Sequence, residues 1–356
     1  MNRFAYLIGI ILTALSLGAC SAVPGSEKTF MAVSWNVEAL FDGKDDGFEY
    51  DEYKASAGWN KEKYEARILS ISKALGGLAE STTPDLIGLV EVENVEVLGD
   101  LAKGELSKYG YNYTFFGTAP GSALGVGALS RFPFTEAKVH SITANGATTP
   151  RPVLELRVGK QGKALVFFIC HWKSKLGGEE LTEGLRRSSA RVLRRRLEEL
   201  HLNEPGLPVV IMGDLNENHD EFYRQANASL SALLPDDPRA AELAGQGRDF
   251  LVVSGEKPPR TRHFNPPILC LYTPWGRELE DGSYYYKSNW ETIDHFLLTP
   301  ELFDNKGWDF ETAKVINQAP FVYASGIPAS YNPKNGLGMS DHLPLALFLR
   351  KADDDV

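Results

Sequence analysis

From residue 30 onward, the spacing of apolar and polar residues predicts strands and helices in mixed order. Short apolar runs rich in β-branched and aromatic residues predict strands beginning at 32–35 and continuing at 86–92, 113–116, 127–130, 153–158, 165–170, 208–212, 283–286, 292–298 and 343–349. Apolar residues three and four positions apart predict helices at 61–78, 98–109 and 185–200, and a helix over 227–244 that breaks near Pro235 and Pro238. Because strands and helices do not strictly alternate, the pattern favours a layered α/β sandwich.

Length and charge narrow the class of protein. The chain has 356 residues, which suits one large α/β domain once an export signal is removed. Its formal net charge of −10 argues against tight wrapping of DNA, since nucleic-acid binders usually carry a basic field. A locally cationic or metal-filled cleft is not excluded by this balance.

The N-terminus carries the pattern of an export signal. Arg3 supplies a positive start, residues 4–17 are apolar, and Leu17-Gly18-Ala19-Cys20 closes the stretch, which is short for a membrane span. Small residues before a cysteine resemble the bacterial lipobox, which implies lipidation of Cys20; the alternative is a plain secretory signal with an incidental cysteine. We therefore expect a signal peptide at 1–19, a tether at 20–29, one folded domain at 30–351 and an acidic tail at 352–356. The expected location is an exported, membrane-anchored lipoprotein at the outer membrane or the periplasmic face.

Two further cysteines, Cys170 and Cys270, each lie within an apolar run. An exported compartment permits a disulfide between them. Buried free thiols are favoured by the apolar surroundings. The sequence leaves the pairing open.

Polar residues recur at the ends of the predicted strands. Each of six segments places Asn, Asp, Glu or His at or beside an apolar run: 34–38 (Ser-Trp-Asn-Val-Glu), 89–91 (Leu-Val-Glu), 171–175 (His-Trp-Lys-Ser-Lys), 213–216 (Gly-Asp-Leu-Asn), 293–295 (Ile-Asp-His) and 340–342 (Ser-Asp-His). Any one of them could be a structural turn. Together they offer what phosphate ester hydrolysis needs: oxygen ligands for a hard cation, a base for water, and hydrogen-bond donors.

The ordered set of these segments resembles the endonuclease/exonuclease/phosphatase superfamily, and residues 36–42 and 90–94 are most similar to its exported bacterial subgroup. The resemblance spans residues 33–345. It implies a DNase I-like fold, a four-layer α/β sandwich of two packed mixed β-sheets flanked by helices, so that 30–351 would form one catalytic domain. It also implies a bound Mg²⁺ or Mn²⁺, with Glu91 as the principal ligand assisted by Asn36, Glu38 and Asp341.

The same resemblance implies catalytic roles. His342, oriented by Asp294, would be a base or a phosphate contact. Asp214 would position or deprotonate water, Asn216 would hold a phosphoryl oxygen, and His171 would donate to the phosphate from the opposite wall. Next to His171, the ammonium groups of Lys173 and Lys175 are candidates for contact with substrate phosphate.

Some positions depart from the subgroup pattern or have ordinary explanations. Position 39 is Ala where the subgroup usually has Asn, and we expect His295 to face away from Asp294 because neighbours alternate along a strand. Four arginines of the 185–200 helix are better explained as a solvent-exposed helix face than as a row of contacts to nucleic-acid phosphates. Tyr284, Tyr285, Tyr286 and Trp290 could stack on a base or a sugar, although such residues usually pack across strands.

The leading hypothesis is thus a metal-dependent phosphoesterase that hydrolyses phosphodiester bonds, as an extracytoplasmic, monomeric endonuclease acting on nucleic acid and held at a membrane through Cys20. One alternative keeps the chemistry but changes the substrate to a phospholipid or an inositol phosphate, as in a sphingomyelinase. Another is a non-catalytic surface binding protein on the same scaffold. The sequence leaves open the substrate, endo versus exo action, and which residue is acid and which is base.

Overall fold

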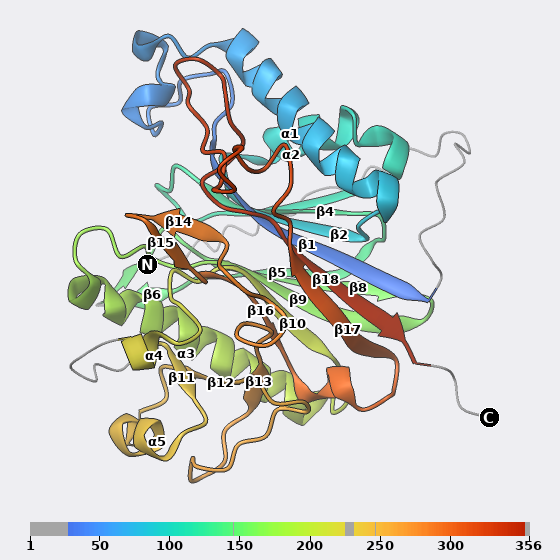
Figure 1. The fold of residues 1–356 in the computed structure, drawn as a ribbon, viewed down its shortest axis with the longest axis vertical. Coiled ribbons are helices and arrows are strands. Elements are labelled where there is room, and N and C mark those ends of the chain that lie inside the picture. The colour runs from blue at the N-terminus through green and yellow to red at the C-terminus, as the bar shows by residue number, and fades with distance from the viewer. Residues whose placement is uncertain (1–27, 145, 225–230, 246, 353–356) are drawn as a thin grey trace, which may run out of the picture.

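Two mixed β-sheets lie face to face in the computed structural model, which describes residues 28–144, 146–224, 231–245 and 247–352 (Figure 1). The six-stranded sheet has the order β17 (Trp308–Val315), β18 (Leu345–Lys351), β1 (Thr29–Leu40), β2 (Leu86–Val92), β4 (Gly125–Ser130) and β3 (Tyr113–Gly117). The eight-stranded sheet has the order β11 (Leu233–Pro235), β12 (Leu251–Ser254), β13 (Cys270–Tyr272), β16 (Asp294–Leu298), β10 (Val209–Asp214), β9 (Lys163–His171), β8 (Val153–Lys160) and β5 (Phe134–His140).

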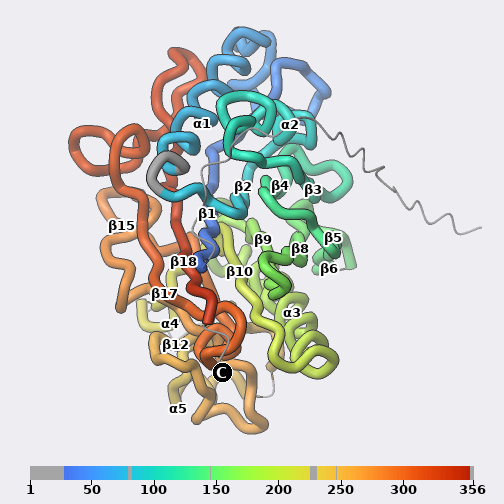
Figure 2. The backbone as a smooth tube through the Cα atoms, turned by 90° about the vertical axis from the view of Figure 1, so that its right-hand side faces the viewer, coloured from blue at the N-terminus to red at the C-terminus, as the bar shows by residue number. Residues whose placement is uncertain are grey.

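Helices cover the outer faces of both sheets. Figure 2 shows α1 (Lys61–Ser81) and α2 (Val95–Lys103) on one side of the stack and α3 (Glu179–Asn203) on the other. The short helices α4 (Glu221–Arg224) and α5 (Pro238–Ala244) pack beside the eight-stranded sheet. Two hairpins form separate two-stranded sheets. They are β6 (Thr143–Ala144) with β7 (Ala147–Thr148), and β14 (Tyr284–Tyr286) with β15 (Asn289–Glu291). The predicted four-layer α/β sandwich is confirmed.

Strand alternation divides the core into layers. In β1, Phe30 and Ala32 pack between the two sheets, whereas Met31, Val33 and Trp35 pack toward α1 and α2. The eight-stranded sheet follows the same rule, with one row of each central strand facing the other sheet and the next row facing α3. The layer between the sheets is the one that leads to the polar strand ends.

Several sequence predictions differ from the observed elements. The second helix runs over Val95–Lys103 rather than 98–109, because the side chain of Asn94 caps it by accepting from the Val97 N–H. Within the predicted 227–244 helix, Leu233–Pro235 forms strand β11, and a helix appears only at Pro238–Ala244. That prediction is wrong in this segment because Ser231 and Glu217 satisfy the backbone N–H of Leu233 outside a helix.

The predicted signal peptide, the lipidated Cys20, the tether up to residue 27 and residues 353–356 of the acidic tail lie outside the described residues. No described helix is both long and apolar enough to cross a membrane. Cys170 and Cys270 are both buried and free, as the apolar runs favoured.

Candidate active site

Four of the predicted site residues continue the apolar rows between the two sheets. Asn36 follows Phe30 and Ala32 in alternation along β1, and the same alternation brings His171 of β9, Asp214 of β10 and Asp294 of β16 to the space between the sheets. The pairing registers of the eight-stranded sheet set Asp214 directly beside His171 and beside Asp294. The site therefore forms where the sheets separate and their apolar rows give way to polar residues.

Glycine and bulged backbone make this edge possible. Gly213 has φ +125°, and a Cβ there would lie 2.0 Å from the carbonyl oxygen of Cys170. Glu91 lies at an irregularity of β2 with φ +66°, which turns its side chain out of the helix-facing row that alternation predicts. Asn216, Glu38 and Ala39 also have positive φ, so strained backbone gathers around this site.

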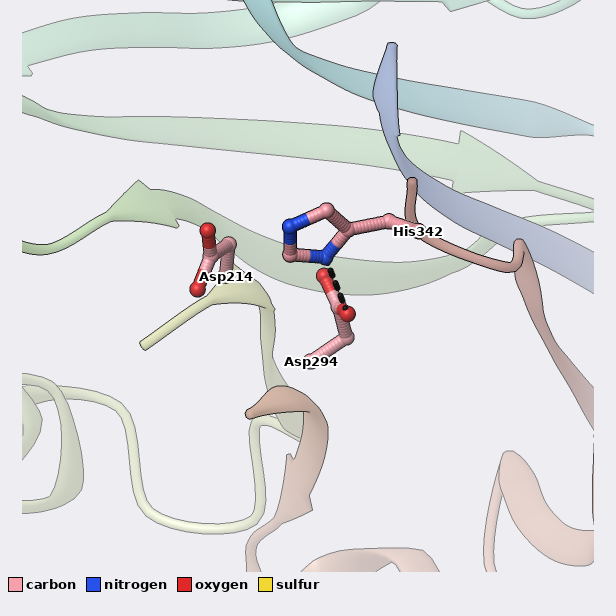
Figure 3. A group of neighbouring side chains, drawn as sticks. All are labelled: Asp214, Asp294 and His342. Carbon is pink, nitrogen blue, oxygen red and sulfur yellow. Dashed lines mark hydrogen bonds and ion pairs between the residues drawn. The ribbon is translucent and has the colours of Figure 1, made fainter. Parts of the chain in front are cut away.

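Asp294 and His342 form a hydrogen-bonded pair at the centre of the site (Figure 3). His342 Nδ1 donates to Asp294 Oδ2 at 2.7 Å, and Ser283 Oγ donates to the same oxygen at 2.6 Å. Burial by itself would lower the pKa of His342, but the carboxylates of Asp294, Asp341 and Asp214 raise it well above its ordinary value. These carboxylates favour the protonated imidazole, and the bond from Nδ1 to Asp294 fixes the orientation of the ring.

His171 has the opposite charge state. Burial and the nearby positive charges of Arg151, His342 and Lys173 lower its pKa well below the ordinary value. Its Nε2 lies 3.6 Å from both Glu91 Oε1 and Asp214 Oδ2. A neutral and a cationic histidine thus belong to one site.

Asn36 ties together carboxylates from both sheets. Its Oδ1 accepts from the Glu38 N–H at 3.0 Å, which fixes the orientation of the amide. Its Nδ2 then donates to Glu91 Oε1 at 3.2 Å and to Asp214 Oδ2 at 3.1 Å. In this arrangement Asn36 positions the two carboxylates instead of offering its oxygen to a cation.

The carboxyl groups of this site repel one another, which makes the cluster suited to a cation. Burial, with repulsion from Asp294, raises the pKa of Asp214 to about 7, and burial together with Glu91 raises that of Asp341. Asp214, Asp294 and His342 offer ligand atoms within 4.8 Å of one another. Since Asp294 Oδ2 and His342 Nδ1 bond to each other, this trio is engaged internally, and Glu91 and Asp341 supply the kind of carboxylate oxygens that a hard divalent ion prefers.

Glu38 lies beside this group but is engaged elsewhere. Its carboxylate accepts from Ser330 Oγ, from the Tyr331 N–H and from the Asp341 N–H at 2.7–2.9 Å. These bonds attach the loop after β17 to β1 and fix the backbone of Asp341. Glu38 thus positions Asp341, and its oxygens are not directed at Glu91.

The two lysines after His171 are also engaged. Lys175 forms ion pairs with Glu221 at 2.7 Å and Glu179 at 3.1 Å. Lys173 donates to the oxygens of Ser174 and to the Leu176 carbonyl. Neither ammonium group points to the Asp294–His342 pair in this structure.

Arg151 is a site residue that the sequence analysis missed. It precedes β8 and donates to the carbonyl of Trp172, which also accepts from Asn216 Nδ2 at 3.1 Å. Its charge acts on both His171 and Asp214. No strand-end pattern marks Arg151, because it comes before its strand; the Arg-Pro pair at 151–152 is the only local signal.

Behind the site, a buried ion pair holds two of its loops together. Arg186 of α3 donates to Glu217 Oε1 at 3.1 Å and to the Lys173 carbonyl at 3.2 Å, and both ionic side chains are fully buried. Glu217 also accepts from the backbone of β11 and its neighbour. His295 faces this side, as predicted, with Nε2 on the Glu217 carbonyl at 2.8 Å.

Comparisons with known proteins agree with this geometry. A family model described as the Endonuclease/Exonuclease/phosphatase family matches residues 31–245. No curated protein sequence matches the chain.

Similar solved structures share the fold at low sequence identity. TDP2 from D. rerio complexed with a single-strand DNA product has a TM-score of 0.51 and 15% identity, covering 90% of this chain and 99% of its own. The human Nocturnin catalytic domain with bound sulfate has a TM-score of 0.51 and 15% identity, covering 91% and 94%. A mannosyl-6-phosphatase from Bacteroides thetaiotaomicron has a TM-score of 0.50 and 14% identity, covering 90% and 99%.

Proposed function

The chain belongs to the endonuclease/exonuclease/phosphatase family, and from that premise we propose that it is a divalent-metal-dependent phosphodiesterase, acting as an extracytoplasmic endonuclease. The family resemblance seen in the ordered motifs is confirmed, and the chain is a phosphoesterase of that superfamily. The observation that carries the finer proposal is the buried pair of Asp294 and His342, which lies in one site with Asp214 and His171 of the same sheet and with Glu91 of the other sheet.

The donor set fits a hard cation. Glu91 and Asp341 would hold Mg²⁺ or Mn²⁺, and such an ion would neutralise phosphoryl oxygens in the transition state. Asn36 and Glu38 support this group by fixing Glu91, Asp214 and the Asp341 backbone.

The residues of the chain divide the proton transfers between them. Asp214, with its pKa raised to about 7, accepts a proton from the attacking water. The new oxygen–phosphorus bond forms as the bond to the leaving oxygen breaks. His342 Nε2 donates its proton to that leaving oxygen, and Asp294 keeps the imidazole oriented and charged. This makes His342 the acid rather than the base.

Donors around the cleft complete the proposal. Arg151 and neutral His171 lie where they could donate to non-bridging phosphoryl oxygens, and Asn216 orders the turn beside them. Nucleic acid is the proposed substrate because the fold neighbour with a DNA product shares this architecture, and because Arg151 brings a positive charge to the site of an otherwise acidic chain.

A substrate panel tests the proposal. Purified protein is incubated with DNA, RNA, sphingomyelin, an inositol phosphate and a sugar phosphate, with Mg²⁺, with Mn²⁺ and with excess EDTA. The expected result is metal-dependent internal cleavage of nucleic acid that EDTA abolishes. Turnover of only the lipid, inositol or sugar substrate would support the alternative phosphoesterase, and a lack of turnover on every substrate would support the binding protein.

A further inference from the structure

The β14–β15 hairpin beside the catalytic histidine carries aromatic side chains on both of its faces. On one face, Tyr285 and Trp290 form a cross-strand pair with ring centroids 5.2 Å apart, and Trp290 packs against the core under α1 and α2. Alternation sends Tyr284 and Tyr286 to the other face. The four aromatics therefore divide into a pair that packs toward the core and a pair on the side of the catalytic histidine.

The second pair continues outward from the catalytic imidazole. The Tyr284 ring stacks on His342 with centroids 4.5 Å apart and an interplanar angle of 28°. Tyr286 lies parallel to Tyr284 at 6.1 Å and 14°, and is 48% exposed. The rings of His342, Tyr284 and Tyr286 thus form a row that runs from the catalytic histidine to the surface.

The hairpin is fixed in this position. Tyr284 pairs with the backbone of His342, the Leu343 N–H donates to the Ser283 carbonyl at 2.7 Å, and Ser283 Oγ bonds to Asp294. Lys287 and Ser288 both have positive φ in the two-residue turn, the geometry of a tight hairpin. The outer ring is consequently held in register with the catalytic pair.

A positive charge lies over the exposed ring. Lys287 Nζ is 5.1 Å from the centroid of the Tyr286 ring, and because the Lys287 side chain is exposed and long, it can leave the ring face for a phosphate when a base stacks there. A planar aromatic face and an ammonium group are therefore presented together, a short distance from the reacting phosphate. Single-stranded nucleic acid alternates these two features, a base that stacks and a phosphate that binds cations.

We infer that Tyr286 and Lys287 form a subsite for the nucleotide next to the scissile phosphate, with the base stacked on Tyr286 and the flanking phosphate near Lys287. This rests on the proposed phosphodiesterase function and deepens it by naming the substrate class as single-stranded or locally opened nucleic acid. The quaternary ammonium of a choline headgroup also binds aromatic faces, but the ammonium of Lys287 over the Tyr286 ring would repel that cation, whereas it attracts the phosphate of a nucleotide.

The test compares two oligomers with the same reporter and length. One is a single-stranded oligodeoxynucleotide, and the other has the same backbone with tetrahydrofuran residues in place of all bases. The variants are Tyr286→Ala, Tyr286→Leu and Tyr286→Phe, with Tyr223→Ala as control because Tyr223 is a comparably exposed tyrosine on α4. The readout is the ratio of kcat/KM for the two oligomers.

Wild type and Tyr286→Phe should prefer the base-bearing oligomer by about ten-fold or more, the range expected for one base–aromatic stack. Tyr286→Ala and Tyr286→Leu should bring the ratio for the two oligomers close to one, and Tyr223→Ala should keep the wild-type ratio. Lys287→Gln should reduce the slope of log KM against log salt concentration by about one, as expected when one phosphate contact is lost.

The alternatives give distinct results. Equal cleavage of both oligomers by wild type, or an equal loss on both in Tyr286→Ala, overturns the subsite and leaves the phosphodiesterase intact. Cleavage of neither oligomer, with turnover of another phosphate ester, overturns the endonuclease and the subsite together.

Discussion

One hydrogen bond, between His342 and Asp294, decides which group of the cleft carries the proton. Because Asp294 holds the imidazole charged and oriented, its loss should disable His342 without removing the ring. We expect Asp294→Asn and His342→Ala each to lower kcat on the order of 10³-fold, with the double variant little worse than His342→Ala alone.

The control for this pair is His201→Ala, an exposed histidine on α3 that should keep full activity. Steady-state kinetics on one phosphodiester, together with melting curves, give the result. Losses that multiply in the double variant would show that the two residues act separately.

Other residues show which features of the site could be predicted from the sequence and which could not. Strand-end patterns found Asn36, Glu91, His171, Asp214, Asp294 and His342, and the structure brings all six together. They could not show that the Asn36 amide is turned by the Glu38 N–H, because this depends on a hydrogen bond and not on spacing. Nor could they show that the loop after β17 binds Glu38 from nearly 300 residues away.

At the scale of elements, alternation was the most reliable guide. It placed His295 on the face away from Asp294, and in the structure the same rule directs one residue of each central strand into the site. It missed β5, whose residues are half-exposed on a sheet edge, and β11 to β13, which are three or four residues long. Glu91 also breaks the rule, since only its positive φ brings it to the catalytic side.

The buried ion pair of Arg186 and Glu217 joins α3 to two catalytic loops. Arg186→Met leaves Glu217 buried without its charged partner, so we expect a loss of about 3–5 kcal/mol in the free energy of unfolding. The matched control is Arg187→Met, which removes a partly exposed pair with Asp249 and should cost about 1 kcal/mol or less.

Urea denaturation at neutral pH measures both variants. Adding Glu217→Leu to Arg186→Met should restore part of the lost stability, since the unpaired charge is removed. Equal losses of unfolding free energy in Arg186→Met and Arg187→Met would show that the buried ion pair contributes no more to stability than the partly exposed one.

A second link between elements gives a pH dependence. Glu155 of β8 is nearly buried; burial would raise its pKa, but His140 and the bidentate contact with Arg196 of α3 lower it from 4.5 to about 2. A lowered carboxyl pKa stabilises the fold above the unfolded value and loses that effect as pH falls from about 4.5 toward 2. The lowering is equivalent to roughly 3 kcal/mol at neutral pH.

We therefore expect Glu155→Gln to unfold at lower urea than wild type at pH 7, with the difference shrinking between pH 4.5 and 2. Glu199→Gln serves as control, because Glu199 contacts the same arginine but is 52% exposed. A stability difference that stays constant over this pH range would refute the charge-based explanation.

At the scale of the whole molecule, the two ends of β1 have different surroundings. Asn36 lies in the cleft, while Thr29 starts the strand about 23 Å away, at the opposite edge of the sheet. An anchor at Cys20 would therefore join the domain through the end of β1 that lies away from the site.

Lipid anchoring is tested by cell fractionation. We expect the wild-type chain to remain with membranes, and Cys20→Ser, which cannot be acylated, to appear as soluble exported protein. The same soluble partition for both chains would refute the anchor and leave the catalytic proposal untouched.

The central claim is that Glu91 and its neighbours hold a divalent cation for phosphate ester hydrolysis. Its most direct test is the Mg²⁺ and Mn²⁺ dependence of kcat in wild type, in Glu91→Gln and in Glu96→Gln, an exposed glutamate on α2 that serves as control. Melting curves with and without Mn²⁺ report binding independently of turnover. We predict metal-dependent turnover and metal-induced stabilisation in wild type and Glu96→Gln, and the loss of both in a folded Glu91→Gln. Undiminished turnover by Glu91→Gln, or by wild type in excess EDTA, would contradict the account.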